Sequence, residues 1–410
     1  MIIKKRSDST VAARRFRANL LALIAVLLFG ASAGCMVDTS AGEDERVLEH
    51  AHAHAHAHAH ASALLSAPQL TTSEKDLAFN SYNNAFYVVN NGNGYYAVDT
   101  NHVVPGRHDF WRVCEQIEAA EDAYERSGNP VYRTMVGELL NGLNNIVSGT
   151  TDFASWNKYN DDVMWAVIAL VRGYEITGNQ TFLDQAQWQF NAVWSRAWDN
   201  QLGGGLWWTT DKTSKNACVN GPAAIAAMLL ARNTVNTGYR SQADQIYGWL
   251  RGTLVNTSTG QVADHIDANG TKVWWAFTYN QGTYAGAAAL LYQNTASNAY
   301  RTDASRAVNW ARSNLTGQHV NDILNDEYDS GGGHGDSCGF KGIFVRWAAK
   351  YANVANDGPI GSWLTTNANA AWAYRNSSGV TWGQWWRRTP DNYVTSWESS
   401  GSVAVTQVAP

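Results

Sequence analysis

The sequence predicts an all-α protein, an (α/α)6 barrel of six helical hairpins that form an inner and an outer ring. From Ser73 onward, helix-type segments follow one another with almost no strand-like alternation. Their connections alternate between short turns and long loops rich in glycine and aromatic residues. The segments after long loops are apolar on every side, as in 163–171, whereas those after short turns mix charged and apolar residues, as in 240–247. A helix that is apolar on every side is buried, so the two kinds of segment indicate two rings.

The predicted barrel is built from consecutive helices along the chain. We place them at 75–90, 108–127, 130–148, 159–177, 180–198, 218–236, 240–255, 279–294, 299–314, 337–354, 358–375 and 391–405. Short turns such as 127–130 and 177–179 join two helices, and long loops such as 199–217 and 256–278 lead to the next inner helix. The long loops and the N-terminal ends of the inner helices therefore meet at one end of the barrel. Functional groups are expected there, because loops on a rigid scaffold carry function.

Residues 1–34 resemble an export signal. Basic residues lead into the apolar run from Leu20 to Phe29, which is too short to be a comfortable membrane span. The segment ends in Ser32-Ala33-Gly34-Cys35, which resembles a bacterial lipobox with Cys35 as the lipidated residue. This predicts an exported lipoprotein at the cell surface or in the periplasm, held to the membrane only through that lipid. Ser32 stands where Leu is usual, so simple cleavage and secretion is the alternative.

Residues 36–72 are expected to form a low-complexity tether before a single domain at 73–410. The tether contains six His-Ala steps from His50 to Ala61. Alternate imidazoles can bind Zn or Ni, but we favour a plain linker and expect no catalytic metal site.

Charge and cysteine usage narrow the class of protein further. Without residues 1–34, the chain has 24 Lys and Arg against 34 Asp and Glu, and a balance of −10 argues against nucleic-acid binding. If Cys35 carries lipid, then Cys114, Cys218 and Cys338 allow at most one disulfide, and no pair has zinc-type spacing. The domain must then rely on its core for stability.

One pair of carboxylates stands at the start of an apolar segment. Asp161 and Asp162 directly precede 163–171, which has no polar side chain. Asp is a good N-cap, and a helix N-terminus favours negative charge, so the pair could serve the helix alone. Two neighbouring carboxyl groups could also act together on a glycosidic bond, one as nucleophile and one as acid.

Aromatic and amide side chains are expected around this pair, at the loop end of the barrel. Tryptophan is unusually frequent, with 19 Trp against 11 Phe, and a sugar ring stacks on aromatic faces while amides bind its hydroxyl groups. The alternatives are amides that satisfy loop backbone and tryptophans that fill gaps in the outer ring, as expected for Trp188, Trp194, Trp249 and Trp310. The candidate substrate-binding residues are Trp111, Trp165, Trp207, Trp208, Asn216, Asn220, Trp274, Trp275, Tyr279, Asn280, Gln281, Phe340 and Lys341.

Four ordered motifs are similar to those of glycoside hydrolase family 76. They are Asp161-Asp162, the segment 215–222, Tyr279-Asn280-Gln281-Gly282, and Phe340-Lys341-Gly342-Ile343. The resemblance runs over about residues 75–375. His334 and Cys338 have no assigned place in this pattern, and the stretch after 376 and the His-Ala tract lie outside it.

The resemblance implies an (α/α)6 barrel and, from the bacterial members, a retaining endo-α-1,6-mannanase. It also implies that Asp161 is the nucleophile and Asp162 the general acid/base, an order that the residues alone leave open. A helix N-terminus favours an ionised Asp161, whereas a second negative charge and burial would have to raise the pKa of Asp162. The implied partner is α-mannan polysaccharide or oligosaccharide, with no cofactor, and we expect a monomer.

Three other functions stay open on the sequence. Fungal members of the family act on cell-wall glycans, which suggests a transglycosylase on the same scaffold. A lipoprotein that binds glycans without cleaving them would use the same tryptophans. A barrel hydrolase or epimerase of different specificity is the third, because a fold does not fix a substrate.

Overall fold

The computed structural model describes residues 68–327 and 335–410 of the chain. The expected export signal, Cys35, the tether with its His-Ala tract and His334 lie outside the described residues, so those interpretations stay predictions. In the described part of the chain, no helix is both long enough and apolar enough to cross a membrane.

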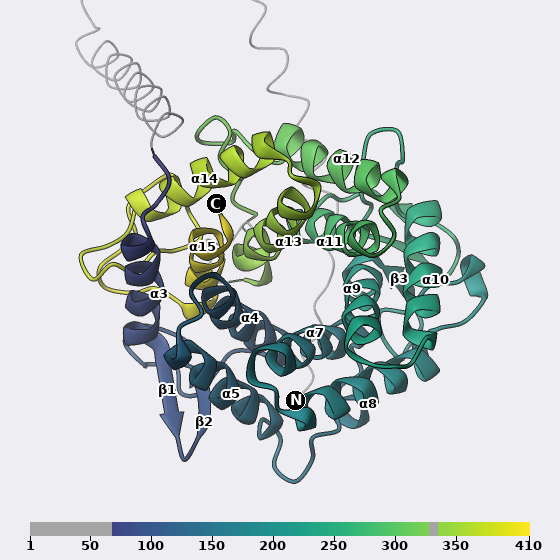
Figure 1. Ribbon diagram of the computed structural model, residues 1–410, viewed down its shortest axis with the longest axis horizontal. Helices are drawn as coiled ribbons and strands as arrows, with labels where there is room; N and C mark the ends of the chain where they lie inside the picture. Colours follow the sequence, from purple (N-terminus) through teal and green to yellow (C-terminus); the bar gives the residue numbers. More distant parts are fainter. Residues whose placement is uncertain (1–67, 328–334) are drawn as a thin grey trace, which may run out of the picture. The chain divides into compact units, whose positions relative to one another are not determined.

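Within the described residues, six helices form a closed inner ring around the centre of Figure 1. Each packs on the next one along the chain, and the last of them, α15, closes the ring against the first, α4. The inner helices are α4 (Phe110–Ser127), α7 (Asn160–Thr177), α9 (Ala217–Asn233), α11 (Thr278–Thr295), α13 (Phe340–Ala355) and α15 (Ser396–Val408).

An outer ring of helices packs against this inner ring (Figure 1). Five of them follow an inner helix after a short turn and pack against it, while α3 packs against α15 and α4. The outer helices are α3 (Thr72–Phe86), α5 (Pro130–Asn144), α8 (Gln180–Ala197), α10 (Gly238–Thr253), α12 (Asn298–Asn314) and α14 (Gly358–Ala373). The all-α (α/α)6 barrel that the alternating connections predict is therefore confirmed.

Small residues let the inner helices approach each other closely. A Cβ added at Gly342 on α13 would lie 2.5 Å from the Cα of Gly401 on α15. A Cβ added at Gly282 on α11 would lie 2.5 Å from the Cα of Phe344 on α13. Real Cβ atoms do not come this close to backbone, so the ring needs glycine at these crossings.

Buried charges cross the inside of the ring, which the apolar pattern does not predict. Arg172 on α7 donates to Glu118 at 2.8 Å and to Asp122 at 2.7 Å, both on α4. Arg346 on α13 donates to the same Asp122 at 2.8 Å and to Glu115 at 2.7 Å. These pairs join three inner helices, and removing one partner would leave an uncompensated buried charge.

Several local elements differ from the prediction. The helix expected at 75–90 ends at Phe86, and its last residues form strand β1 (Tyr87–Asn90), which pairs with β2 (Asn93–Tyr96). Asn91 and Gly92 join them with φ values of 50° and 73°, as a tight hairpin turn requires. The long loops contain the short helix α6 (Phe153–Trp156), the 3-10 helices η1 (Gln201–Gly203) and η2 (Asp336–Gly339), and the sheet β3 (Ser214–Asn216), β4 (His265–Asp267) and β5 (Lys272–Val273).

The start of the last helix is also later than expected. Instead of 391, it begins at Ser396, where the N-cap Thr395 accepts from the backbone N–H of Glu398 in a capping box.

Candidate active site

Asp161 and Asp162 lie in the first turn of α7, at the end of the ring that the long loops surround. The N-cap of this helix is Tyr159, and its side chain makes no capping bond. Neither acid is therefore the N-cap that one explanation of the pair required. Both side chains are half-buried, so they are partly shielded from water and still reachable from it.

Asp162 is the more strongly perturbed carboxyl of the pair. Burial and the neighbouring charge of Asp161 raise the pKa of Asp162 to about 8. The carboxylates of Asp109 and Asp336 act in the same direction, whereas a 2.8 Å hydrogen bond from Asn157 Nδ2 to Asp162 Oδ2 opposes the rise. Asp162 therefore keeps its proton near neutral pH.

Asp161 ionises more readily than its neighbour. Burial raises the pKa of Asp161 to about 6, and interactions with the Trp208 and Cys218 side chains and with backbone amides of the first turn hold it below that of Asp162. Its Oδ1 is buried without a hydrogen-bond partner among the described residues. Asp161 therefore has the lower pKa of the two carboxyls.

Asn160 fixes the position of the first turn from the side of the next loop. Its Nδ2 donates to the carbonyl of Trp207 at 2.8 Å, and its backbone N–H donates to the carbonyl of Trp208 at 2.8 Å. Asn160 is completely buried, so this link holds the acids against the loop that carries Trp208.

Part of the expected aromatic set does gather at this end. The ring centroids of Tyr279 and Phe340 lie 4.1 Å apart, and those of Phe340 and Trp111 lie 6.2 Å apart, which joins the starts of α11, α13 and α4. On the other side, Trp208 lies 5.4 Å from Tyr159 in a tilted pair. These five rings are half-buried or exposed, so they present aromatic surface near the acids.

Trp274 and Trp275 are the most exposed members of the predicted set. They are 43% and 64% exposed, beside the short strand β5, and Trp275 lies 6.2 Å from His265 in an edge-on contact. Large exposed aromatic side chains next to each other are available to a ligand.

Two predicted substrate contacts are wrong because their side chains are enclosed. Trp165 is 2% exposed within the core. Trp207 is 1% exposed, and its Nε1 donates to Asp199 Oδ2 at 2.6 Å. Trp188, expected to fill a gap in the outer ring, is instead 62% exposed.

The predicted polar contacts mostly hold loop backbone. Asn220 is buried and bonds both the N–H and the carbonyl of Leu206, at 2.8 and 3.0 Å. The amide of Gln281 satisfies Gly260 O and Val262 N. These two amides therefore fix loops from within and are unavailable to a sugar, which corrects their assignment as substrate contacts.

The remaining polar candidates are also committed to neighbours. Lys341 is buried and donates to Asp326 Oδ1 at 3.0 Å. Asn216 Oδ1 accepts from the Ser214 hydroxyl at 2.6 Å. Asn280 Nδ2 donates to Asp264 Oδ1 at 3.2 Å, while its Oδ1 has no partner among the described residues. The structure thus gives Lys341 and Asn216 supporting roles in the loops.

Two residues that the sequence analysis did not single out lie next to the acids. Asn157 bonds Asp162, and Cys218 contacts Asp161 and Tyr279. Cys218 lies inside the motif 215–222, so the sequence could have indicated it as a site residue, whereas Asn157 belongs to none of the motifs. Cys114 and Cys338 are also free and buried, as is Cys218, so none of these three pairs with another.

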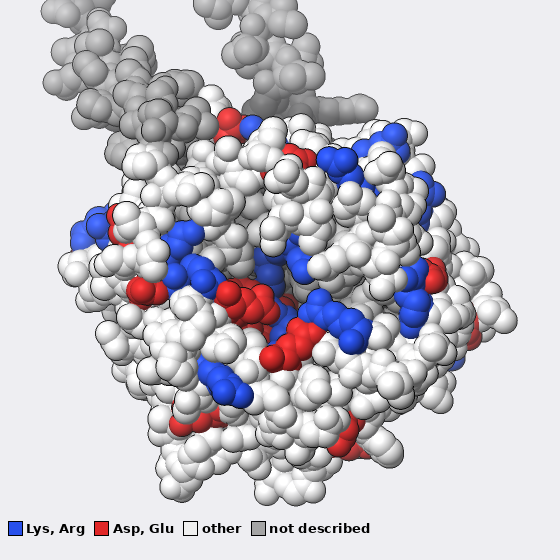
Figure 2. Space-filling view, viewed as in Figure 1, with Lys and Arg blue, Asp and Glu red and all other residues white. Residues whose placement is uncertain are grey.

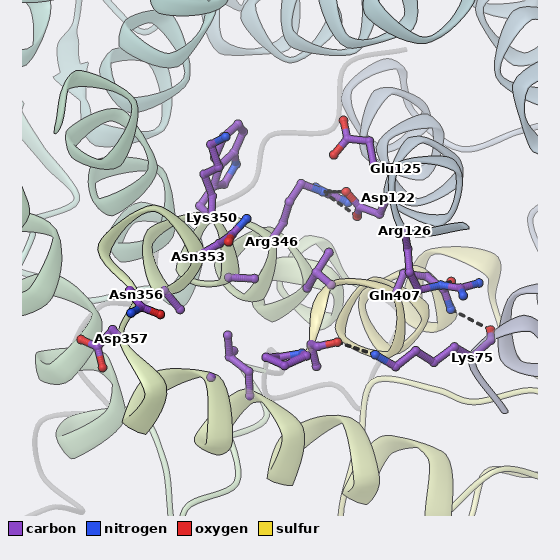
Figure 3. A pocket seen from close by; sticks show the side chains of 18 of the residues that line it. Lys75, Asp122, Glu125, Arg126, Arg346, Lys350, Asn353, Asn356, Asp357 and Gln407 are labelled. Carbon is purple, nitrogen blue, oxygen red and sulfur yellow. Dashed lines mark hydrogen bonds and ion pairs between the residues drawn. The ribbon is translucent and has the colours of Figure 1, made fainter. Parts of the chain in front are cut away.

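A charged hollow lies at the opposite end of the ring, at the C-terminal ends of the inner helices. A cavity of about 820 Å³ lies there, and Figure 3 shows Asp122, Arg346 and Lys350 among its lining side chains. Figure 2 shows acidic and basic side chains around a hollow at the centre of the face viewed. Arg172 lines this cavity, and at 1.5 Å per residue it is about 16 Å along α7 from Asp161.

Three arginines that line this hollow are paired with acids. Arg346 and Arg172 are bound to the acids of α4, and Arg232 forms an ion pair with Glu175. Cations near helix C-termini also stabilise the helix dipoles. These arginines therefore have a structural explanation, and Asp161 and Asp162 lie at the other end of the ring.

Comparison with known proteins identifies the family. The sequence profile of glycosyl hydrolase family 76 matches residues 72–408. The chain belongs to glycosyl hydrolase family 76. The match continues past residue 376, beyond the motifs that the sequence analysis used, so α15 is part of the family domain.

Family 76 relatives in yeast are similar to this chain over much of its length. The mannan endo-1,6-α-mannosidase DFG5 of Saccharomyces cerevisiae is 28% identical over 340 residues, which cover 76% of this chain and 70% of that protein. The mannan endo-1,6-α-mannosidase DCW1 of the same organism is 31% identical over 242 residues, which cover 55% of this chain and 53% of DCW1. The matched region thus spans about half the length of DCW1.

A solved family 76 structure has the same fold. The GH76A α-1,6-mannanase from Salegentibacter sp. HEL1_6 superposes with a TM-score of 0.73 at 28% identity, covering 82% of this chain and 98% of the mannanase. The structure of an inactive variant of that mannanase, in which two adjacent aspartates are replaced by asparagine, contains bound α-1,6-mannotriose. It superposes on this chain with the same TM-score and identity.

Proposed function

We propose that this protein is a retaining glycoside hydrolase that cleaves α-1,6-mannosidic bonds within mannan. Asp161 is the nucleophile, and Asp162 is the general acid/base. The observation that carries the proposal is the difference in pKa between two adjacent, half-buried carboxyls at the loop end of the ring. The substrate class is supported by the mannan endo-1,6-α-mannosidases and the mannotriose complex among the family relatives.

The chemistry proceeds in two steps that use the pair in turn. Ionised Asp161 attacks the anomeric carbon, while protonated Asp162 gives its proton to the leaving glycosidic oxygen, which forms a glycosyl ester and releases one half of the chain. Asp162, now ionised, then takes a proton from water, which attacks the same carbon and frees Asp161. Two displacements at one carbon retain its configuration.

The partly buried positions of the acids suit both steps. Burial keeps a proton on Asp162 near neutral pH, where an ordinary aspartate would have lost it. The charge of Asp161 keeps that proton in place until attack begins, and the loss of charge on Asp161 then makes Asp162 a stronger acid. The half-buried Trp208 and the exposed Trp274 and Trp275 supply stacking surface for neighbouring sugars.

The test uses the purified protein with debranched α-1,6-mannan. We expect new reducing ends from the unaltered protein, and a loss of about 10²–10⁴-fold in kcat for Asp162→Asn, as for other general acids. Asp161→Asn should lose activity at least as severely. Asp211→Asn is the control, because Asp211 is an exposed acid of a nearby loop that pairs with Lys158.

Other outcomes separate the rival functions. Binding of mannan without turnover, unchanged in Asp162→Asn, would indicate a glycan-binding protein. Longer products that form only when mannooligosaccharide acceptor is added would indicate a transglycosylase. We also retain residues 73–410 as the catalytic domain and export to the cell surface as parts of this proposal.

A further inference from the structure

Asn157, in the loop before α7, directly contacts one of the proposed catalytic acids. Its Nδ2 donates to Asp162 Oδ2 at 2.8 Å, and its Oδ1 accepts from the backbone N–H of Tyr159 at 2.9 Å. The side chain is buried, so water does not compete well for either bond. The two ends of one amide group thus join the loop backbone to the Asp162 carboxyl.

Arg196, on the outer helix α8, holds the same loop from behind. Its guanidinium donates to the carbonyl of Asn157 at 2.9 Å, to Asn160 Oδ1 at 2.7 Å and to the carbonyl of Ala154. The donors of arginine have a fixed planar geometry, so three bonds from one side chain leave the loop little freedom. The backbone of Asn157 is therefore fixed before substrate arrives.

We propose that Asn157 is a positioning residue that orients the Asp162 carboxyl and determines which of its oxygens transfers the proton. In a neutral carboxyl the carbonyl oxygen is the better acceptor, so donation from Asn157 to Oδ2 favours the tautomer of Asp162 with its proton on Oδ1. This leaves Oδ1 to face the glycosidic oxygen. The inference rests on the proposed function and extends it to a residue outside the acid pair.

The surroundings of Asp162 explain why such a donor is needed. Asp161 on its own helix, Asp109 before α4 and Asp336 in η2 all raise its pKa, and Cys114 on α4 also faces it. Arg112 is paired with Asp336. Asn157 provides the hydrogen bond that favours the ionised form of Asp162 against these neighbouring carboxylates. Without it, the proton would be held more tightly and the carboxyl would be free to rotate.

Two substitutions distinguish a role of Asn157 in positioning Asp162 from a role in holding the loop backbone at Tyr159. Asn157→Ala removes both bonds of the side chain. Asn157→Asp keeps an oxygen that accepts from Tyr159 N–H but replaces the donor to Asp162 by a second acceptor. Asn376→Ala is the matched control, because Asn376 is also buried, accepts from Ser378 N–H at 3.0 Å and donates to Pro390 O at 3.0 Å, away from the acids.

The pH profile of kcat and kcat/KM on α-1,6-mannooligosaccharide is the main measurement. We expect both Asn157 variants to lose about tenfold in kcat at neutral pH, with KM changed by less than about twofold. We expect the apparent pKa of the alkaline limb, above which activity falls, to rise by about one pH unit in Asn157→Ala and by more in Asn157→Asp. Asn376→Ala should keep the kcat of the unaltered protein and the same alkaline limb of its pH profile. An alkaline limb that stays in place in Asn157→Asp would overturn the proposal.

A second measurement keeps the two proposals distinguishable. Carbon NMR titration of the Asp162 carboxyl reports its pKa in the folded protein whether or not mannan is cleaved. A higher pKa in Asn157→Asp supports the positioning role, and an unchanged one contradicts it. If the unaltered protein cleaves no mannan, the proposed function fails while this result still decides the role of Asn157.

Discussion

The unequal protonation of Asp161 and Asp162 makes pH a direct perturbation of the proposed mechanism. The structure gives a pKa of about 6 for Asp161 and about 8 for Asp162. Only the form with one proton on the pair carries both a nucleophile and an acid. With these two values, about four fifths of the protein has that form at pH 7 and about one tenth at pH 5 or pH 9.

The signs of the two limbs follow from the roles of the acids. Below about pH 6, Asp161 becomes protonated and loses its nucleophilic oxygen. Above about pH 8, Asp162 becomes ionised and has no proton to give. We therefore expect kcat/KM to fall about tenfold for each pH unit beyond either limb.

Initial rates on α-1,6-mannooligosaccharide across this range test the reasoning, with unfolding measured in the same buffers. The Asp211→Asn variant should give the same profile, because Asp211 is exposed and its ion pair is with Lys158 and not with either acid. Activity that keeps rising below pH 5, or stays level to pH 10, in a protein that remains folded would refute the assignment.

Three further predictions concern stability and binding. Arg346→Met should lower the free energy of unfolding by about 3–5 kcal/mol, because it leaves buried acids of α4 without their partner. Arg232→Met, at an exposed ion pair, should lower it by only about 0–1 kcal/mol. Equal losses for the two variants in urea unfolding would contradict this. Trp275→Ala should raise KM with little change in the free energy of unfolding. Trp207→Ala, at a buried position, should lower the free energy of unfolding of the protein by about 3–5 kcal/mol. The reverse pattern would show that Trp275 supports the fold. Because the pKa of Asp162 is raised to about 8 in the folded protein, its ionisation costs stability as pH rises from the ordinary aspartate pKa of about 4 to about 8. The stability of Asp162→Asn relative to the unaltered protein should therefore increase by about 4 kcal/mol between pH 5 and pH 9; a difference independent of pH would be inconsistent with the raised pKa.

The sequence predicts the arrangement of the rings because burial leaves a periodic signal. Helices such as α7 are apolar on all sides only when neighbours surround them, and short turns fix which helices are adjacent. The end of the ring that carries the acids follows from the same pattern. The hairpin at 87–96 was also predictable in principle, since Asn91-Gly92 is a strong turn signal.

The finer assignments depend on contacts between distant parts of the chain. Asn220 has the composition of a sugar contact, yet both ends of its amide bind Leu206, fourteen residues earlier. The doublet Trp207-Trp208 divides, with one ring enclosed and the other at the rim, because adjacent side chains in an extended loop point to opposite sides. The pairs of Arg172 and Arg346 with α4 cross the ring and have no local pattern.

The stereochemistry of the first product tests the central claim most directly. Proton NMR of the anomeric region, recorded within minutes of adding the protein to α-1,6-mannooligosaccharide, shows the new reducing end before it equilibrates with the other anomer. The account predicts that the α-anomer appears first, because two displacements through Asp161 retain configuration. A β-anomer formed first would show that water attacks directly, and Asp161 would then not be the nucleophile.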